Sequence, residues 1–145
     1  MTKLYTIGFT KKSASTFFGL LQKSGASRLV DVRLNNVSQL AGFAKRDDLA
    51  YFVGELCGMD YRHELLLAPT QMMLNSYKKH GGSWADYERL FIDLIAERRV
   101  EDVISQESLD NAVLLCSEAT PHQCHRRLVA EYLAERWNGV TVEHL

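Results

Sequence analysis

The sequence has few cysteines and prolines, no long apolar run and no excess of one charge. Three cysteines are too few for the disulfide framework of a small secreted domain. No stretch reaches about 18 apolar residues, so we expect no membrane-spanning helix and no contact with a membrane. The 17 basic and 18 acidic side chains nearly balance. This balance argues against broad, non-specific binding of nucleic acids but leaves a local basic patch open.

Residues 1–6 lead directly into a strand-like pattern and lack the apolar run of a secretion signal. We therefore expect a cytoplasmic protein with reduced thiols. The chain has 145 residues, 46% of them hydrophobic, and it contains no internal repeat and no linker-like tract. These are the size and composition of one domain, which we expect to span residues 1–145.

Short apolar and β-branched stretches alternate with segments of helical periodicity. Strands are predicted over residues 4–9, 28–33, 59–64, 112–116 and 140–144. Helices are predicted over residues 13–24, 47–57 (capped by Asp47), 69–80, 83–99 (capped by Ser83), 100–105 and 121–137, and a loop over 34–46. Strand followed by helix, repeated, indicates an α/β domain: a mostly parallel central sheet of about five strands flanked by helices. Ligands of such sheets bind beyond the carboxyl ends of the strands.

Residues 113–127 hold the densest group of reactive side chains: two thiols, a carboxylate, two imidazoles and two guanidiniums. Their pattern predicts a buried strand, a polar loop and the first turn of a helix. A helix start has unpaired backbone N–H groups and a partial positive charge. Together with a thiol and Arg126, it predicts an anion-binding or nucleophilic site.

Cys124 and His125 lie one turn before the apolar stripe of the predicted helix, so both are expected to point inward. The helix start and Arg126 would lower the pKa of Cys124 and favour a nucleophilic thiolate. The alternative is that Cys124 fills core space like a small apolar side chain. His125 is either a general base or a partner of a backbone carbonyl. Cys116 ends the predicted strand and is expected in the core.

Arg126 lies on a mixed face of the predicted helix, where it either binds an anion or pairs with Glu118. Glu118 follows the predicted strand directly and would orient Arg126 or His125, or cap the helix. Asp31 and Arg33 alternate along one strand and therefore share a face. An Asp in an apolar strand needs a partner, so Arg33 either pairs with Asp31 or contacts a bound anion.

Cys116, His122, Cys124 and His125 are residue types that bind zinc. Their spacing lacks the paired Cys-x2-Cys units of a zinc ribbon. Side chains of adjacent residues on a helix also diverge by about 100°, which would hinder joint ligation by Cys124 and His125. We therefore predict no metal ion. No phosphate-binding loop or dinucleotide-binding motif is present, and no cofactor is predicted.

Several segments together resemble one protein family. These are residues 6–9 (TIGF), 29–33 (LVDVR), 114–118 (LLCSE), 121–126 (PHQCHR) and 142–145 (VEHL). In this order they resemble the family called domain of unknown function 488. The resemblance implies a compact α/β domain whose distinctive residues are Arg33, Glu118, Cys124, His125 and Arg126. It implies no particular reaction.

The chain departs from that family at two places. Phe9 stands where the family has a histidine, and residues 65–69 (LLLAP) replace a glycine-rich turn. A role that the family's histidine or its glycine-rich turn has in a pocket therefore cannot be assigned to this chain.

Three hypotheses remain. The first is a small cytoplasmic enzyme with an anion- or phosphate-binding pocket that acts on a nucleotide or phosphorylated substrate. Arg126 and Arg33 would bind the anion, and Cys124, His125 and Glu118 would be catalytic. The second is a non-catalytic module that binds a nucleotide or the end of a nucleic acid. The third is a structural scaffold with buried arginine–carboxylate pairs. The oligomeric state is not predicted.

Overall fold

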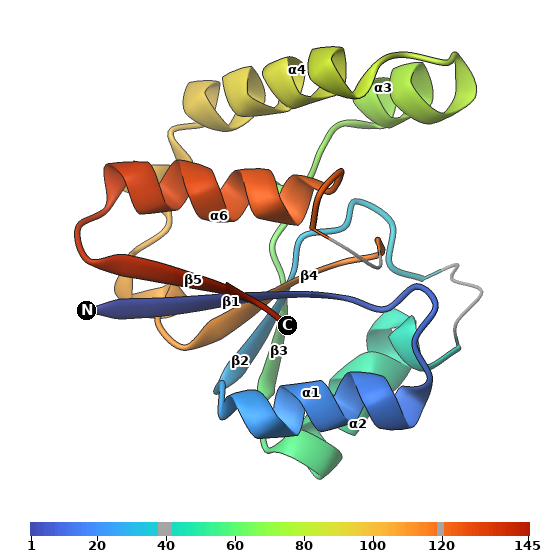
Figure 1. The fold of residues 1–145 in the computed structure, drawn as a ribbon, viewed down its shortest axis with the longest axis vertical. Helices are drawn as coiled ribbons and strands as arrows, with labels where there is room; N and C mark the ends of the chain where they lie inside the picture. Colours follow the sequence, from blue (N-terminus) through green and yellow to red (C-terminus); the bar gives the residue numbers. More distant parts are fainter. Residues whose placement is uncertain (38–41, 119–120) are drawn as a thin grey trace.

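A five-stranded sheet forms the centre of the computed structural model, which describes residues 1–37, 42–118 and 121–145. Its strands are β1 (Thr2–Gly8), β2 (Arg28–Asp31), β3 (Asp60–His63), β4 (Ala112–Cys116) and β5 (Val140–His144). They lie in the order β3-β2-β4-β1-β5, and every neighbouring pair is parallel (Figure 1). The predicted α/β class with a parallel sheet is confirmed.

Helices cover both faces of this sheet (Figure 1). On one face lie α1 (Ala14–Ser24) and α2 (Arg46–Cys57). The other face carries α4 (Trp84–Glu97) and α6 (His125–Arg136), with the short helices α3 (Gln71–Leu74) and α5 (Val100–Val103) beside them. Three short 3₁₀ turns are formed by Gly42–Ala44, Leu65–Leu67 and Glu107–Leu109. Within the described part of the chain, no helix has the length and apolar character that a membrane crossing requires.

Alternate side chains of each central strand enter different halves of the core. Leu4 and Leu114 pack under α4 and α6, whereas Ile7 and Leu115 pack against α1 and α2. Successive side chains of a strand point to opposite faces, so a sheet covered on both sides needs apolar residues at consecutive positions. The run Ala112–Cys116 meets this requirement and is buried throughout.

Several predicted boundaries require correction. α2 begins at Arg46, and its N-cap is Lys45, so Asp47 lies in the first turn, where its carboxylate faces the positive helix end. The predicted helix over residues 69–80 is divided into α3 and a π-helical turn, Asn75–Lys79. The predicted N-cap Ser83 is confirmed, since its side chain accepts a hydrogen bond from the backbone N–H of Asp86.

Two further boundaries affect the functional residues. β2 ends at Asp31 rather than at residue 33, because the Asp31 carboxylate binds both the backbone N–H and the guanidinium of Arg33 and so turns the chain. The last helix begins at His125 rather than at residue 121, because Cys124 is extended (φ −140°, ψ 137°) and acts as its N-cap. Part of the predicted loop over residues 34–46 lies outside the described residues.

Candidate functional site

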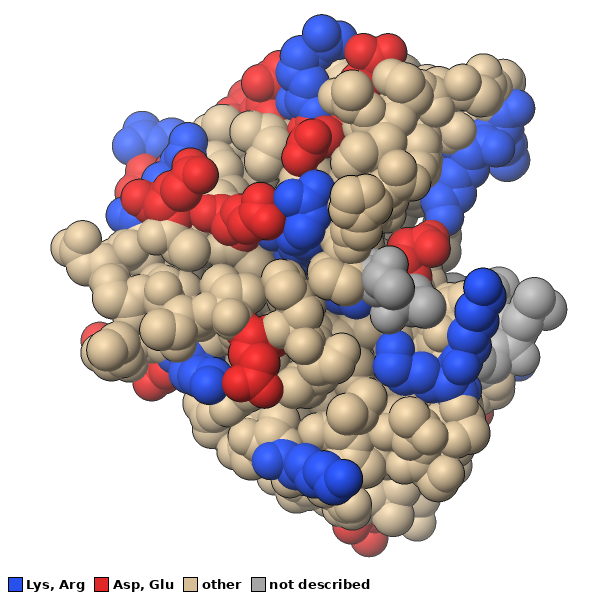
Figure 2. Space-filling model, viewed as in Figure 1, with Lys and Arg blue, Asp and Glu red and all other residues tan. Residues whose placement is uncertain are grey.

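A pocket of about 150 Å³ opens at the carboxyl ends of β2 and β4, beside the start of α6. This is the edge at which the parallel sheet was expected to bind ligands. The surface is hollowed there, between the upper helical layer and the sheet edge (Figure 2). The pocket is lined by Arg33, Leu34, Asn35, Pro69, Leu74, Tyr77, Lys78, Trp84, Tyr87, Cys116, Ser117, Glu118, Gln123, Cys124 and His125.

The segment after β4 is held close to β1 by a glycine and a buried arginine. Arg126 Nη1 donates a hydrogen bond to the backbone oxygen of Glu118 at 2.7 Å. A Cβ atom at Gly8 would lie 1.5 Å from that same oxygen and 2.7 Å from Arg126 Nη1. Glycine at position 8 is therefore required for the approach of these two segments.

Of the two alternatives for Arg126, a side-chain pair with Glu118 is wrong, because Arg126 reaches the backbone oxygen of Glu118 instead. The Glu118 carboxylate forms an ion pair with Lys78 at 3.3 Å, at the rim of the pocket. Arg126 is fully buried and is not among the residues that line the pocket. Its Nε and Nη2 atoms have no hydrogen-bond partner among the described residues, and Nη1 also lies 3.5 Å from the Cys124 sulfur.

This buried cation has no carboxylate counterion among the residues that the structure describes. A buried charge is strongly unfavourable unless another charge or several hydrogen bonds compensate it. The thiol groups of Cys116 and Cys124 lie nearby, and each becomes negatively charged when it loses its proton. A thiolate in this pocket would therefore stabilise Arg126, and Arg126 would stabilise the thiolate.

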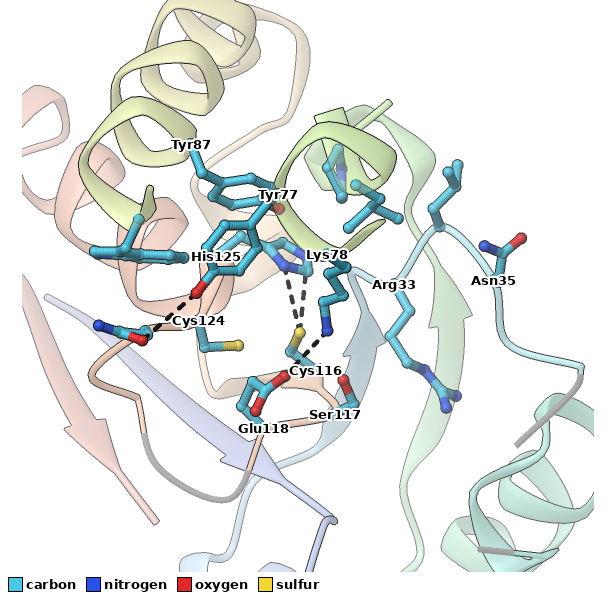
Figure 3. Close-up of a pocket in the computed structure, with 15 residues that line it drawn as sticks. Arg33, Asn35, Tyr77, Lys78, Tyr87, Cys116, Ser117, Glu118, Cys124 and His125 are labelled. Carbon is cyan, nitrogen blue, oxygen red and sulfur yellow. Dashed lines mark hydrogen bonds and ion pairs between the residues drawn. The ribbon is translucent and has the colours of Figure 1, made fainter. Parts of the chain in front are cut away.

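His125 connects β2 to the sulfur of Cys116. Its Nε2 atom lies 2.7 Å from the backbone oxygen of Val32. Its Nδ1 atom lies 3.3 Å from the Cys116 sulfur (Figure 3). A carbonyl oxygen only accepts hydrogen bonds, so Nε2 carries a proton and donates it to Val32. Nδ1 of the neutral ring then accepts the thiol proton of Cys116. Burial lowers the pKa of His125 and favours this neutral ring.

The two thiols have opposite acidities. Burial acts to raise the pKa of Cys116, but its net shift is downward because four causes oppose burial. In order of size, these are the Cys124 thiol, the charge of Arg126, and the backbone N–H groups of Ser117 and of Glu118. Burial, followed by the interaction with Cys116, raises the pKa of Cys124. The expected lowering of the Cys124 pKa is therefore wrong, and Cys116 is the sulfur that favours the thiolate.

Arg33 forms the predicted pair with Asp31, in which Nε and Nη2 each bind one carboxylate oxygen at 2.8 and 2.7 Å. Both side chains are buried, and Tyr61 and Asn36 also donate to the Asp31 carboxylate. Arg33 lines the pocket, and its Nη1 atom has no hydrogen-bond partner in the described part of the chain. Its guanidinium points away from Cys116 and His125 (Figure 3).

Helical residues that the sequence analysis did not select cover the pocket from above (Figure 3). The π-helical turn Asn75–Lys79 carries Tyr77, whose hydroxyl lies 3.5 Å from Gln123 Oε1, and Lys78, which pairs with Glu118. Tyr77, Trp84 and Tyr87 form a cluster of rings 5.1–5.7 Å apart. Single π-helical turns occur frequently at functional sites. The helical pattern of residues 69–80 predicted one continuous helix and contained no signal for this turn.

Three potential metal ligands also converge here. One ligand atom each from Cys116, Cys124 and His125 lies within 4.8 Å of the others. The expectation that Cys124 and His125 diverge is wrong, because it placed both on the helix, whereas Cys124 is the extended N-cap. His122 is exposed and does not belong to this cluster.

Comparison with known proteins agrees with the resemblance in the sequence. No curated protein matches the chain. No solved structure matches it either. The model of one family, Domain of unknown function DUF488, matches residues 13–133, a span that includes Arg33 and all of residues 116–126. The chain therefore belongs to the family described as Domain of unknown function DUF488.

Proposed function

We propose that this protein is a thiol-dependent enzyme in which Cys116 is the nucleophile and His125 its general base. The observation that carries this proposal is the 3.3 Å contact between Cys116 Sγ and His125 Nδ1, with Nε2 held by the Val32 carbonyl. A nucleophile, a base and a third group that orients the base form the arrangement that activates catalytic thiols. Cys124, the nucleophile expected from the sequence, becomes a hydrogen-bond donor to Cys116.

In the proposed reaction, the Cys116 thiol proton passes to His125 Nδ1 while the sulfur bonds to an electrophilic carbon or phosphorus. The bond to the leaving group breaks, and the leaving group takes the proton from His125. Water, deprotonated by His125, then cleaves the covalent intermediate and restores the thiol. The backbone N–H groups of Ser117 and Glu118 act to lower the pKa of Cys116 and would stabilise negative charge beside the reacting atom.

We propose a small anionic substrate, a nucleotide or a phosphorylated metabolite. The ammonium group of Lys78, at the pocket rim, would bind the anion. The Arg33 guanidinium is buried against Asp31 and points away from Cys116 and His125, so it would contribute positive charge without direct contact. The rings of Tyr77, Trp84 and Tyr87 supply an apolar wall for a planar group. The volume of about 150 Å³ lies below the roughly 300–1,000 Å³ of pockets for drug-sized ligands, so it suits a small phosphorylated metabolite or one part of a nucleotide.

Alkylation of the full-length reduced protein with iodoacetamide, followed by peptide mass mapping, tests the nucleophile. We expect Cys116 to react fastest in the folded protein and Cys124 to react slowly. His125→Gln should lower the rate at Cys116 at neutral pH, whereas Cys57→Ser, a change outside the pocket, should leave it unchanged. Faster reaction of Cys124 than of Cys116, or an unchanged rate in the His125 variant, would refute the assignment.

Thermal melting against a panel of nucleotides, phosphate and sugar phosphates tests the substrate class. A ligand at 100 times its Kd should add about 2.7 kcal/mol to the free energy of unfolding. Lys78→Met should reduce the shift if this cation binds the anion. A ligand shift without Cys116 reactivity would instead support the non-catalytic binding module.

A further inference from the structure

Cys116, Cys124 and His125 form a compact, buried group with two sulfur ligands and one nitrogen ligand. We propose that these three residues bind a thiophilic metal ion with a filled d shell, Zn²⁺ or Cu(I). Soft thiolate ligands select such ions, and imidazole suits both. The binding site follows from the ligand atoms alone and does not rest on the proposed enzymatic reaction.

The spacing of the three ligand atoms suits such an ion. Zn–S and Zn–N bonds of about 2.3 and 2.0–2.1 Å in a tetrahedral site place neighbouring ligand atoms roughly 3.5–3.8 Å apart. The Cys116 sulfur and His125 Nδ1 are already 3.3 Å apart, and all three ligand atoms lie within 4.8 Å of one another. Small side-chain movements would therefore complete the geometry.

The outer contacts of His125 are those of a metal ligand. Metal-binding histidines usually donate their second ring N–H to a carbonyl or carboxylate, which sets the ring orientation. His125 Nε2 has this contact with the Val32 carbonyl at 2.7 Å, so Nδ1 presents its lone pair to the Cys116 sulfur, and the Cys124 sulfur lies within 4.8 Å. Phe91 packs against the imidazole ring with its centroid 5.3 Å away and restricts its rotation.

The charges around the site favour a metal with two thiolates. Cu(I) with both thiolates carries a net charge of about −1, which the buried guanidinium of Arg126 would neutralise. Zn²⁺ with both thiolates is neutral, and its fourth position would face the pocket that all three ligands line. Three protein ligands with one open position are the arrangement of catalytic zinc sites.

Metal and substrate would compete for the same sulfur. A bound ion occupies the lone pairs of Cys116, so metal loading would block its alkylation. Only this consequence rests on the proposed function.

The test uses the full-length, reduced, metal-stripped protein. Co²⁺ is added as a spectroscopic probe for the Zn²⁺ site, and Zn²⁺ and Cu(I) are titrated separately against a chromogenic chelator. We expect one equivalent to bind, with thiolate-to-cobalt charge-transfer absorption. Cys116→Ser and Cys124→Ser should each weaken metal binding by at least about 100-fold. Removing a residue that only supports a ligand costs up to about 100-fold in metal affinity, so removing a ligand itself should cost at least as much. Cys57→Ser is the matched control and should bind like the natural sequence.

A second measurement on the natural sequence tests the metal site even if the cysteine variants fail to fold. In the natural sequence, one equivalent of metal should protect Cys116 and Cys124 from iodoacetamide but leave Cys57 as reactive as before. Absence of stoichiometric binding at micromolar protein, or unchanged binding in both pocket cysteine variants, would overturn the metal site. Slow alkylation of metal-free Cys116 would contradict the proposed enzyme without affecting the metal site, so the two failures are distinguishable.

Discussion

Replacement of Gly8 by alanine tests the packing that supports the pocket. The new Cβ would lie 1.5 Å from the Glu118 backbone oxygen, 2.6 Å from its carbonyl carbon and 2.7 Å from Arg126 Nη1. Two of these three atoms belong to backbone, so a change of rotamer cannot relieve the contact. β1 and the segment after β4 must separate, and the hydrogen bond between Arg126 and Glu118 is lost.

The expected loss of stability follows from two contributions. Overpacking of a well-packed interior costs about 1–3 kcal/mol. Loss of a hydrogen bond to a charged group costs about 1.5–3 kcal/mol. We therefore expect Gly8→Ala to lower the free energy of unfolding by roughly 2.5–6 kcal/mol, the sum of the two contributions. Urea denaturation followed by circular dichroism measures it.

Gly19→Ala is the matched control, because a Cβ at Gly19 in the interior of α1 meets no atom within 4 Å. Alanine is the better helix former, so this variant should gain about 0.5–1 kcal/mol. A Gly8→Ala protein that unfolds within about 0.5 kcal/mol of the natural sequence, the usual range of surface substitutions, would refute the packing argument.

Two further predictions concern the Asp31 cluster. Asp31→Asn leaves the buried Arg33 guanidinium without its counterion and should lower the free energy of unfolding by about 3–5 kcal/mol in chemical denaturation. The control Glu131→Gln breaks an exposed ion pair with Arg127 and should lower it by less than about 0.5 kcal/mol. Equal losses in the two variants would contradict the burial argument. Burial, together with the hydrogen bond to Asp31, raises the pKa of Tyr61 above its ordinary value of 10.0. The unfolded chain therefore loses the Tyr61 proton first, and its stabilising contribution, complete below pH 10, should decline as the pH rises further. Tyr61→Phe should flatten the alkaline decline of the melting temperature, and an unchanged slope would contradict this assignment.

Much of the fold could be predicted from the sequence because its signals are local. The Ser83 cap and the consecutive apolar residues of β4 follow from rules that act within a few positions. The same rules predicted a candidate site at the carboxyl ends of the strands, and a pocket opens at that edge of the sheet. They failed at the start of α6, where the extended conformation of Cys124 changes the direction of its thiol.

The detailed chemistry of the site depends on contacts between distant segments. His125 binds a carbonyl 93 positions earlier, and Lys78 reaches a carboxylate 40 positions later. The pKa difference between Cys116 and Cys124 arises from burial and from their mutual hydrogen bond. Periodicity and spacing contain no information on any of these contacts, so the sequence pointed to Cys124, whereas these contacts lead us to propose Cys116 as the nucleophile.

The strand order has a consequence for how the chain acquires its structure during synthesis. Among the described residues, β1 pairs only with β4 and β5, and β2 meets β1 only through β4. Until residues 112–116 leave the ribosome, the backbone N–H and C=O groups of β1 therefore have no partner strand within the described fold. Pairings between such distant segments form slowly, and the folding intermediates expose apolar surface that is prone to aggregation. Folding should therefore be late and cooperative, and nascent chains arrested before β4 should be substrates for chaperones.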